Sequence, residues 1–533
     1  MKHQCNSDFK LTFYLLFLLN ILITLKSAHS MIQSNEKDLF VKRKNDWRIG
    51  HIVYEVFLDR FSQPENVEKK KYLYPSPKKL HTSWNDKPKK GQYLEKYSVW
   101  SHETEFWGGD FASFKKKLSY LKELGIEVIY FHPIFHAFTN HKYDTIDYIK
   151  IDPAYGTHEE LVELIKVLHK KGMRVILDGV FNHMGDKSPL FIDALKNKQS
   201  TYRDFFKFTQ DNTYIGWSNA KSLPELNLLH ESVQKYIFLD QNSILQSYLR
   251  NENIDGWRLD VAHDIGFSTL KKITLAAHSA KSDSITIGET YNYPEKWLTV
   301  VDGIINMHAR QLILALIEGK ISGPIALDMW EEMIHDAGIE NILKSWIVLD
   351  NYDTQRLSSI LKKPFQIKLA QVLQLTLPGS PCIYYGSEVG MKGAEDPAQR
   401  APMRWDLVKN TNSIYTLFKR LIHIRKSEPA LRYGNFRKLT SKTSFAFMRT
   451  TDSIHECILI IMNPTNKKIQ EFIQIPESKI QDYTELNDLL SKKSFIVHAG
   501  TLELGIPPYE VFILKPNIVI PANGYSRYDQ IIE

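Results

Sequence analysis

Four acidic side chains stand where short apolar runs of the sequence end. Asp178 follows MRVIL, Asp260 follows GWRL, Glu289 follows SITIG, and Asp353 follows SWIVLDNY. A single carboxylate at such a place is most often a helix cap or part of a solvated turn. Several carboxylates that converge on one rim repel each other, and a fold keeps such a group for acid–base chemistry, a metal or a cationic transition state.

Two of these acids suit glycoside cleavage, in which an oxocarbenium-like transition state forms between an ionised and a protonated carboxyl. Arg258 stands two residues before Asp260, and the period of two places both side chains on one face of a strand. We expect the guanidinium to keep the pKa of Asp260 low, as a nucleophile requires. Glu289, crowded by anionic neighbours, would have the raised pKa of a general acid. The spacing alone does not decide which acid takes which role.

These residues need a scaffold that brings distant strand ends together. Eight short apolar runs alternate with helical segments, the pattern of an α/β fold of the (β/α)8 TIM barrel type, whose chemistry lies at the C-terminal ends of the strands. An open doubly wound sheet is the alternative, but no glycine-rich phosphate loop supports it. The predicted strands cover 52–57, 126–131, 173–180, 254–260, 284–289, 301–307, 345–350 and 380–386.

The sequence pattern also divides the chain into parts. The barrel is predicted over residues 47–430, with a small subdomain inserted after strand 3 at about 182–227. Residues 31–46 are polar and are interpreted as a linker. Short strands separated by turns predict a C-terminal all-β sandwich over 431–516, followed by a polar tail, 517–533, without assigned structure.

The composition excludes several classes of protein. Hydrophobic residues make up 43% and charged residues 24% of 533 residues, which argues against a disordered chain or a polytopic membrane protein. Three cysteines exclude a disulfide scaffold and a multi-thiolate zinc site. The net charge of +7 is a mild excess without a basic, aromatic-interleaved stripe, so no nucleic-acid partner is expected. The lysine-rich segment 65–97 is interpreted as a solvated surface insertion.

Residues 1–30 have the form of a secretory signal peptide. The apolar run LTFYLLFLLNILITL, residues 11–25, follows a lysine-bearing region, and Ala28 and Ser30 supply the small residues of a cleavage site. Fifteen apolar residues are short for a membrane-spanning helix, which needs about 20. We therefore predict a secreted or periplasmic protein. An uncleaved membrane anchor is the alternative.

Five segments, taken together, resemble the ordered motifs of the α-amylase family, glycoside hydrolase family 13. Four of them are DGVFNH (178–183), GWRLDVAH (256–263), GET (288–290) and NYD (351–353), and LPELN (223–227) resembles the fifth. Each motif alone is a weak signal, but four or five in the right order are specific. The similarity extends over nearly all of the chain after the N-terminal segment.

The resemblance implies roles for the matching residues. Asp260 would be the nucleophile, Glu289 the general acid/base, and Asp353 would bind hydroxyls of the sugar being attacked. The mechanism would be retaining, with the two key carboxyls roughly 5–5.5 Å apart. The other residues expected to bind substrate or shape its site are Arg258, His183, Tyr143, Asp178, His141, Tyr352, Asp396 and Arg400.

Some of these implied roles are specific. Arg258 would orient Asp260, and Tyr143 would stack under the sugar at the −1 subsite. Within the family, several stretches look like the cyclomaltodextrinase and neopullulanase group. The run DPAQRAPMRWD resembles enzymes that act on short α-glucosides, and its Asp396 and Arg400 either contact sugar hydroxyls or form a structural salt bridge.

The fourth motif departs from the family pattern, because Tyr352 stands between Asn351 and Asp353 where the family has histidine. Tyrosine keeps one hydrogen-bond donor, on a longer side chain with a much higher pKa. The change indicates a tuned or slowed enzyme, an altered specificity, or a protein that binds sugar without turnover. The three retained carboxylates argue against a complete loss of activity.

The resemblance therefore implies hydrolysis of α-1,4 bonds, and of some α-1,6 bonds, in maltooligosaccharides, cyclodextrins or related α-glucans. A transglycosylase or an α-glucosidase on short sugars is the nearest alternative, and a weakly active carbohydrate-binding protein is the alternative of another class. No cofactor is required. Calcium is a candidate ligand, since Asn182 matches a calcium-binding asparagine of many α-amylases. Trp217 and Trp297 are candidate sugar platforms or plain packing residues.

Overall fold

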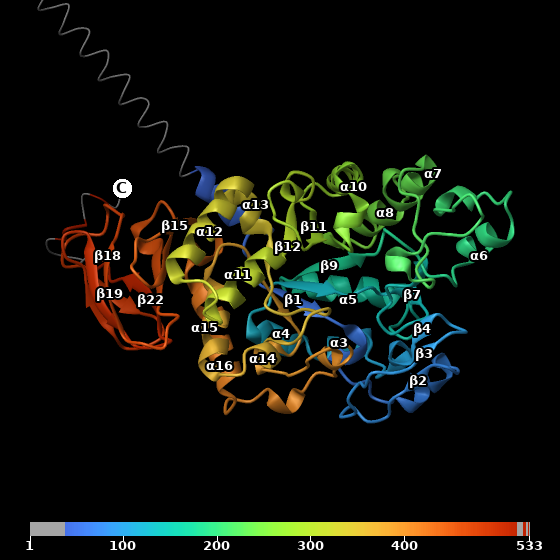
Figure 1. The fold of residues 1–533 in the computed structure, drawn as a ribbon, viewed down its shortest axis with the longest axis horizontal. Coiled ribbons are helices and arrows are strands. Elements are labelled where there is room, and N and C mark those ends of the chain that lie inside the picture. The colour runs from blue at the N-terminus through green and yellow to red at the C-terminus, as the bar shows by residue number, and fades with distance from the viewer. Residues whose placement is uncertain (1–37, 520–525, 529–530, 532–533) are drawn as a thin grey trace, which may run out of the picture.

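The computed structural model describes residues 38–519, 526–528 and 531. Its centre is a closed barrel of eight parallel strands with helices around it, which confirms the predicted TIM barrel and excludes the open sheet (Figure 1). The barrel strands are β1 (Val53–Val56), β6 (Val128–Phe131), β9 (Arg174–Gly179), β10 (Gly256–Leu259), β11 (Ile285–Thr290), β12 (Gly303–Asn306), β13 (Trp346–Ile347) and β14 (Ser380–Tyr384).

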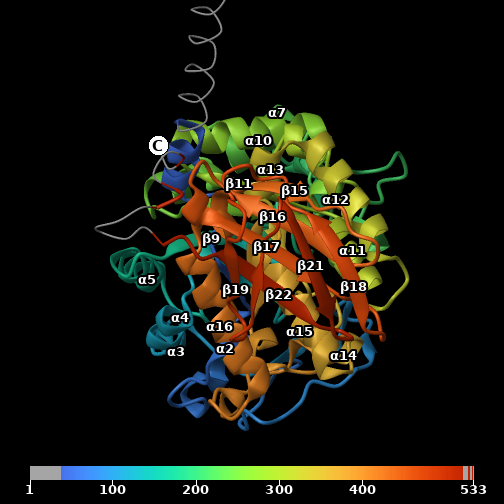
Figure 2. The same ribbon diagram turned by 90° about the vertical axis from the view of Figure 1, so that its left-hand side faces the viewer.

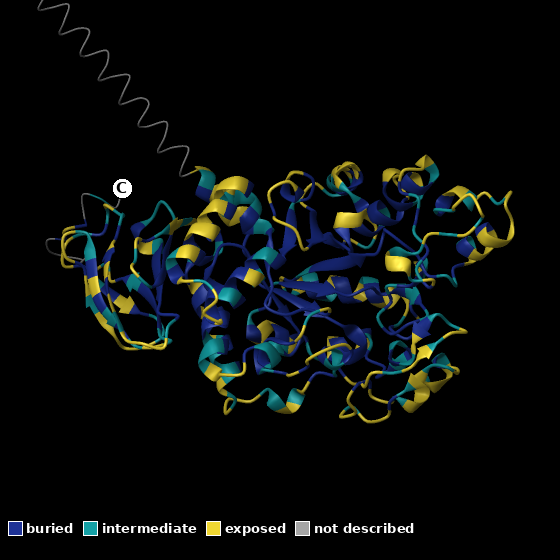
Figure 3. Cartoon of the chain, viewed as in Figure 1, coloured by how far each residue is buried: buried dark blue, intermediate teal, exposed yellow. Residues whose placement is uncertain are grey.

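The barrel strands are buried on both faces, as parallel strands covered by helices must be. On β10, Trp257 and Leu259 pack outward into the core shared with the helices, while Arg258 between them points inward. Residues such as Ile176, Ile287 and Trp346 fill the barrel interior. Figure 3 shows the strands as the most deeply buried part of the molecule. The predicted catalytic side chains therefore lie above a barrel interior that is filled by apolar side chains.

Helices cover the barrel because each presents an apolar stripe to it. Helix α5 begins with a capping box, in which Thr157 Oγ1 accepts from the Glu160 amide at 3.2 Å and Glu160 Oε2 accepts from the Thr157 amide at 2.8 Å. Helix α4 ends at Gly125, whose φ of +94° favours glycine. The α-helices of the barrel region are α2 (Leu58–Phe61), α3 (Phe111–Lys115), α4 (Leu118–Leu124), α5 (His158–Lys170), α6 (Pro189–Lys196), α7 (Glu231–Gln234), α8 (Ile244–Arg250), α9 (Ala262–Ile265), α10 (Phe267–Ala280), α11 (Met307–Ile317), α12 (Gly323–Ala337), α13 (Ile339–Lys344), α14 (Leu357–Ile360), α15 (Pro364–Thr376), α16 (Ser413–Ser427) and α17 (Pro429–Tyr433).

An inserted segment follows each of the first three barrel strands. The segment after β1 carries β2 (Lys79–Leu80), β3 (Tyr93–Leu94), β4 (Val99–Trp100) and β5 (Glu105–Phe106), and the segment after β6 carries β7 (Phe135–Ala137) and β8 (Thr145–Ile151). The segment after β9 contains α6 and irregular chain joined by isolated bridges such as His183 to Glu225. All three lie at one end of the barrel (Figure 1).

The C-terminal region is an all-β sandwich, as predicted. One sheet contains β15 (Asn435–Lys438), β16 (Phe445–Thr450), β17 (Cys457–Met462), β22 (Val511–Pro516), β19 (Glu485–Asp488) and β20 (Ser494–Ile496), and β18 (Ile469–Gln474) pairs with β21 (Thr501–Ile506). Met448 and Ile473 belong to the core between the sheets, whereas Phe445 and Phe447 belong to the core of the barrel region. Alternate residues of β16 therefore attach the sandwich to the barrel, at the end away from the insertions (Figures 1 and 2).

The predicted linker over 31–46 is wrong for its second half. Residues 38–45 are helical, and Phe40 and Arg43 are buried. Arg43 Nη1 donates to the Tyr433 carbonyl at 3.2 Å, so this segment is part of the folded body. The tail is also not without structure, because Tyr528 is buried and its hydroxyl bonds the Thr484 hydroxyl.

The predicted signal peptide, residues 1–30, lies outside the described residues. Among the residues that are described, no helix has both the length and the apolar character needed to cross a membrane.

Candidate active site

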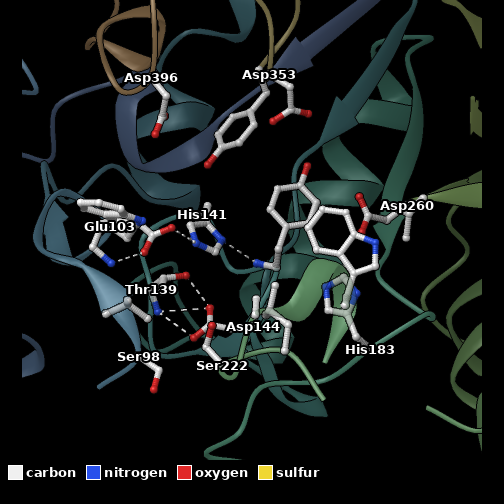
Figure 4. A pocket seen from close by; sticks show the side chains of 18 of the residues that line it. Ser98, Glu103, Thr139, His141, Asp144, His183, Ser222, Asp260, Asp353 and Asp396 are labelled. Carbon is white, nitrogen blue, oxygen red and sulfur yellow. Dashed lines mark hydrogen bonds and ion pairs between the residues drawn. The ribbon is translucent and has the colours of Figure 1, made fainter. Parts of the chain in front are cut away.

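A cavity of about 740 Å³ opens at the C-terminal ends of the barrel strands. Most of the predicted site residues line it. In Figure 4, Asp260 and His183 lie at the right of the cavity, Glu103 and His141 lie toward the left, and Asp353 and Asp396 lie at the top. The predicted residues in the cavity wall are Tyr143, His141, His183, Asp260, Glu289, Tyr352, Asp353, Asp396 and Arg400.

The Arg258 guanidinium contacts the predicted catalytic acids Asp260 and Glu289 from the barrel side of the cavity. Its Nη1 donates to Asp260 Oδ1 at 2.7 Å and to Asp178 Oδ1 at 2.8 Å, and its Nη2 lies 2.7 Å from Glu289 Oε1. All four side chains are buried. Asp260 and Glu289 thus contact the two terminal nitrogens of one guanidinium, so their carboxyl groups face the same small volume. Their separation of 5–5.5 Å remains a prediction.

The charge balance of this cluster differs from the prediction for Asp260. Burial raises the pKa of the Asp260 carboxyl well above its ordinary value; Arg258 opposes that shift, and Glu289 and Asp178 add to it. One guanidinium faces three carboxylates, so it does not neutralise them all. We infer that the buried cluster favours the protonated form of Asp260 in the unliganded site.

A strained residue connects the same two acids. Val261, directly after Asp260, has φ +42° and ψ +48°, which is unusual for a β-branched residue. Its amide donates to Glu289 Oε2 at 2.9 Å, so one Glu289 oxygen is held by the main chain and the other by Arg258. These two contacts fix the Glu289 carboxyl beside Asp260.

Asp353 is presented by a turn after β13. Asn351 Oδ1 accepts from the amides of Asp353 at 3.2 Å and Thr354 at 3.0 Å, which shapes that turn. The Asp353 side chain is 39% exposed and lies 3.3 Å from Arg400 Nη2. Arg400 Nη1 also pairs with Asp396 at 2.7 Å. Asp396 and Arg400 therefore form the salt bridge that was one of the two alternatives, and both residues also line the cavity.

Tyr143 lies between the cavity and the charged cluster. Its hydroxyl donates to Asp178 Oδ2 at 3.1 Å, and its amide donates to His141 Nδ1 at 3.1 Å. Tyr130 donates to the same Asp178 oxygen at 2.6 Å. The Arg258 guanidinium carbon lies 6.0 Å from the centre of the Tyr143 ring. Asp178, which does not line the cavity, thus acts as an anchor for its floor.

His183 offers open hydrogen-bonding capacity. Both of its ring nitrogens are buried without a partner in the described part of the chain. Burial lowers the pKa of His183 to about 3, so the ring is neutral, with one donor and one acceptor for a ligand. Trp217 stacks on it at 5.5 Å and lines the cavity. Trp297 does not line the cavity; it is buried against Phe267, so the plain packing interpretation holds for it.

Tyr352 fits the cavity wall as a buried aromatic. The Arg400 guanidinium carbon lies 3.6 Å from the ring centre, and the Tyr352 carbonyl accepts from Arg400 Nε at 3.2 Å. The hydroxyl is buried and has no partner among the described residues. It is therefore a free donor at the cavity, which is what the histidine of the family motif would also supply.

Two groups of residues were missed by the sequence analysis. The segment 65–97 is not wholly a surface insertion, because Tyr93 on β3 lines the cavity. Trp100, just beyond that segment on the paired strand β4, lines it as well. The alternation of YLEKYSVW with its aromatic ends was a signal for this hairpin. Glu55 and His132 lie behind the cavity, and both are at strand ends, so the rule that selected Asp178 and Glu289 applied to them as well.

The structure offers no clear calcium site at Asn182. The Asn182 Nδ2 atom is buried without a partner, but calcium needs several oxygen ligands, mainly carboxylates. No group of three His, Cys, Asp or Glu side chains that could hold a metal ion occurs in the described ranges. Calcium at Asn182 therefore stays a prediction.

The model of the alpha amylase catalytic domain matches residues 55–434. The chain belongs to the α-amylase family. The match begins within β1 and covers the other seven barrel strands and every predicted site residue, which confirms the resemblance seen in the motifs. The family is one of glycoside hydrolases, so the chain is an enzyme of that class.

Individual relatives agree with this assignment. The chain is 32% identical to a cyclomaltodextrinase of Geobacillus thermopakistaniensis over 89% of this chain and 77% of that protein. It is 30% identical to neopullulanase 2 of Thermoactinomyces vulgaris over 88% and 78% of the two chains. The solved structure of the type III pullulan hydrolase from Thermococcus kodakarensis superposes with a TM-score of 0.73 at 27% identity, over 88% of this chain and 82% of that one.

Proposed function

We propose that the protein is a retaining glycoside hydrolase of α-1,4 bonds, and of some α-1,6 bonds, in maltooligosaccharides, cyclodextrins or related α-glucans. The observation that carries this proposal is the contact of one guanidinium with both Asp260 and Glu289 at the floor of a cavity. Relatives named cyclomaltodextrinase and neopullulanase support the substrate class.

The residues suggest a two-step mechanism. Ionised Asp260 attacks the anomeric carbon while Glu289 gives its proton to the leaving oxygen, and the glycosidic bond breaks. Glu289 then takes a proton from water, whose oxygen attacks the same carbon and releases Asp260. Positive charge developing on the bound sugar favours the ionised form of Asp260 that attacks it.

The cavity favours short substrates. Its volume of about 740 Å³ is that of a small-molecule pocket, and aromatic rings border it from two insertions. Tyr93 and Trp100 stand on the β3–β4 hairpin and Trp217 on the segment after β9. Such faces suit the apolar surfaces of sugar rings. We therefore expect maltotriose and cyclodextrins to be cleaved faster than starch.

The test is turnover of the chain from residue 31 onward with maltotriose, β-cyclodextrin, pullulan and soluble starch, beside the Asp260→Asn variant. Products from wild type alone, released with the α configuration when followed by NMR, support the proposal. Binding of maltotriose without turnover by wild type would instead make this a carbohydrate-binding protein. Transfer of sugar to an added acceptor, in preference to water, would identify a transglycosylase.

We further propose that the enzyme needs no metal ion and that it is exported. The donor set around Asn182 supports the first statement, and the apolar run 11–25 with Ala28 and Ser30 supports the second. Unchanged turnover after dialysis against EDTA tests the former. A mature N-terminus at Met31, found by mass spectrometry of the secreted protein, tests the latter, and an intact N-terminus in the membrane fraction would indicate an anchor.

A further inference from the structure

A buried pair of titratable side chains lies behind the cavity and takes no part in the mechanism above. Glu55 on β1 and His132, directly after β6, are both about 97% buried, and His132 Nε2 lies 2.8 Å from Glu55 Oε1. Neither side chain lines the cavity. A buried pair that serves only packing would be replaced by apolar side chains at little cost in stability, so its contacts need an explanation.

The pair contacts the cavity wall at two places. Glu55 Oε1 accepts from the Tyr352 amide at 3.1 Å, and His132 Nδ1 lies 3.3 Å from the Tyr143 hydroxyl. The same hydroxyl lies 3.1 Å from Asp178, which binds Arg258. A continuous line of hydrogen bonds thus runs from Glu55 through His132 and Tyr143 to the guanidinium beneath the catalytic acids.

The number of available protons decides which group donates and which accepts along this line of hydrogen bonds. Tyr143 has one hydroxyl proton and two partners, and an ionised Asp178 can only accept. When Tyr143 donates to Asp178, His132 must donate from Nδ1 to the Tyr143 oxygen. A neutral His132 then has a bare Nε2, and Glu55 must be protonated to donate to it. When Glu55 is ionised, Nε2 carries the proton and Nδ1 competes with Asp178 for the proton of Tyr143.

We propose that Glu55 and His132 are a positioning pair that sets the direction of the Tyr143 hydroxyl and thereby the hydrogen bonding of Asp178 beneath the catalytic acids. The inference rests on the proposed function and on the role that the family resemblance implies for Tyr143, which would stack under the attacked sugar. The protonated state of Glu55 holds Tyr143 toward Asp178, and the ionised state draws it toward His132. Sugar binding at this platform is then weaker when Glu55 is ionised.

The surroundings of the pair favour the protonated state of Glu55 at neutral pH. Burial raises the pKa of Glu55 to about 8; the Tyr352 amide and Arg258 oppose this shift, and Asp353 and Asp350 add to it. Cys382 lies on β14, and its Sγ atom is 4.0 Å from Glu55 Oε2. The Cys382 thiol is neutral because burial raises its pKa.

Burial also lowers the pKa of His132 to about 3, and Asp178, Arg258, Asp353 and Arg400 are the charges that act on it. The doubly protonated ring is therefore excluded. Near pH 8 the pair loses one proton to solvent, and the remaining imidazole proton then stays at Nε2 beside ionised Glu55.

The test compares pH profiles of kcat and KM for wild type and Glu55→Gln with maltotriose. We expect wild-type kcat/KM to fall about tenfold more between pH 6.5 and 9 than that of Glu55→Gln, mainly through KM. Glu388→Gln is the matched control, because Glu388 is equally buried and its carboxyl accepts from Tyr54 and Tyr120, away from the cavity. Its profile should follow the wild type. Superimposable profiles of wild type and Glu55→Gln would overturn the inference.

Two further measurements keep the outcomes separate. Maltotriose binding to Asp260→Asn and to Asp260→Asn with Glu55→Gln, by calorimetry at pH 6.5 and 9, tests the pair without turnover. The single variant should lose affinity at pH 9 and the double variant should not. Should Glu55→Gln fail to fold, His132→Gln replaces it in the same comparison. An inactive wild type that shows this pH-dependent binding contradicts the proposed function but supports the pair.

Discussion

Two regions of the molecule hold buried charged side chains by different kinds of partner. At the junction of barrel and sandwich, Arg449 donates four hydrogen bonds to main-chain carbonyls, those of Thr376, Leu431, Gly434 and Asn435 at 2.9–3.2 Å. At the rim of the barrel, Arg258 donates to carboxylates that crowd each other. Its Nε atom is buried without a partner among the described residues.

The difference separates structural polar groups from functional ones. Glu471 in the sandwich resembles Arg449, because it accepts from the amides of residues 442–444 and from the Ser444 hydroxyl. Main-chain partners do not move, so these charges are fully satisfied in the folded state. The rim leaves the nitrogens of His183 and the hydroxyl of Tyr352 open, and a ligand can complete them. Stability is therefore concentrated in one region and chemistry in the other.

The largest effect is expected for Asp260→Asn. This variant removes the nucleophile and should lower kcat by about 10⁴-fold or more. It also removes a carboxylate from a crowded buried cluster, so we expect an unfolding free energy equal to the wild type or higher by about 1 kcal/mol. Steady-state kinetics and urea denaturation measure the two effects. A strongly destabilised variant would show that the rim is structural after all.

Arg449→Leu should give the converse result. Four carbonyls lose their donor, and we expect the unfolding free energy to fall by about 3 kcal/mol or more. The value of kcat per folded molecule should stay within twofold of the wild type, because Arg449 lies in the junction with the sandwich. Denaturation curves followed by assays below the transition check this. A selective loss of kcat without a loss of stability contradicts the division between the regions.

Glu55 allows a pH test of the comparison. Its pKa of about 8 exceeds the ordinary value of 4.5, so between these values the folded state binds a proton that the unfolded state lacks. Its contribution to stability is therefore present at low pH and is lost as pH rises through 8. Between pH 5.5 and 8 we expect the unfolding free energy to fall about 3 kcal/mol more in wild type than in Glu55→Gln. Equal pH slopes would show that Glu55 is ionised in the folded protein.

The smallest effect on stability is expected for Tyr352→Phe. The hydroxyl has no partner in the described chain, so its removal should change the unfolding free energy by less than about 0.5 kcal/mol. Since Tyr352 lines the cavity, we expect kcat/KM to fall about tenfold. Tyr143→Phe is the matched variant, because its hydroxyl bonds Asp178, and it should lose about 1 kcal/mol of stability as well as activity. An unchanged kcat/KM for Tyr352→Phe would show that the hydroxyl does not serve the sugar.

Much of the fold and of the site followed from local patterns. Seven of the eight strands fall within the predicted ranges and β11 ends one residue beyond its range, because apolar runs bounded by polar residues form buried parallel strands whatever surrounds them. Asp260, Glu289 and Asp353 were found by their place at strand ends. The helix over residues 38–45 was missed, because its polar sequence shows its few buried side chains only once the barrel is there to cover them.

The sequence by itself determined the barrel, the sandwich, the family and the identity of the acids, because each depends on residue type and on spacing along the chain. Only the tertiary structure decided which carboxylates share Arg258 and that the pKa of Asp260 is raised rather than lowered. It also decided that Tyr93 and Trp100 line the cavity and that Glu55 and His132 pair behind it. These properties depend on burial and on distances between residues far apart in sequence. A local pattern carries no information on either until the barrel has closed.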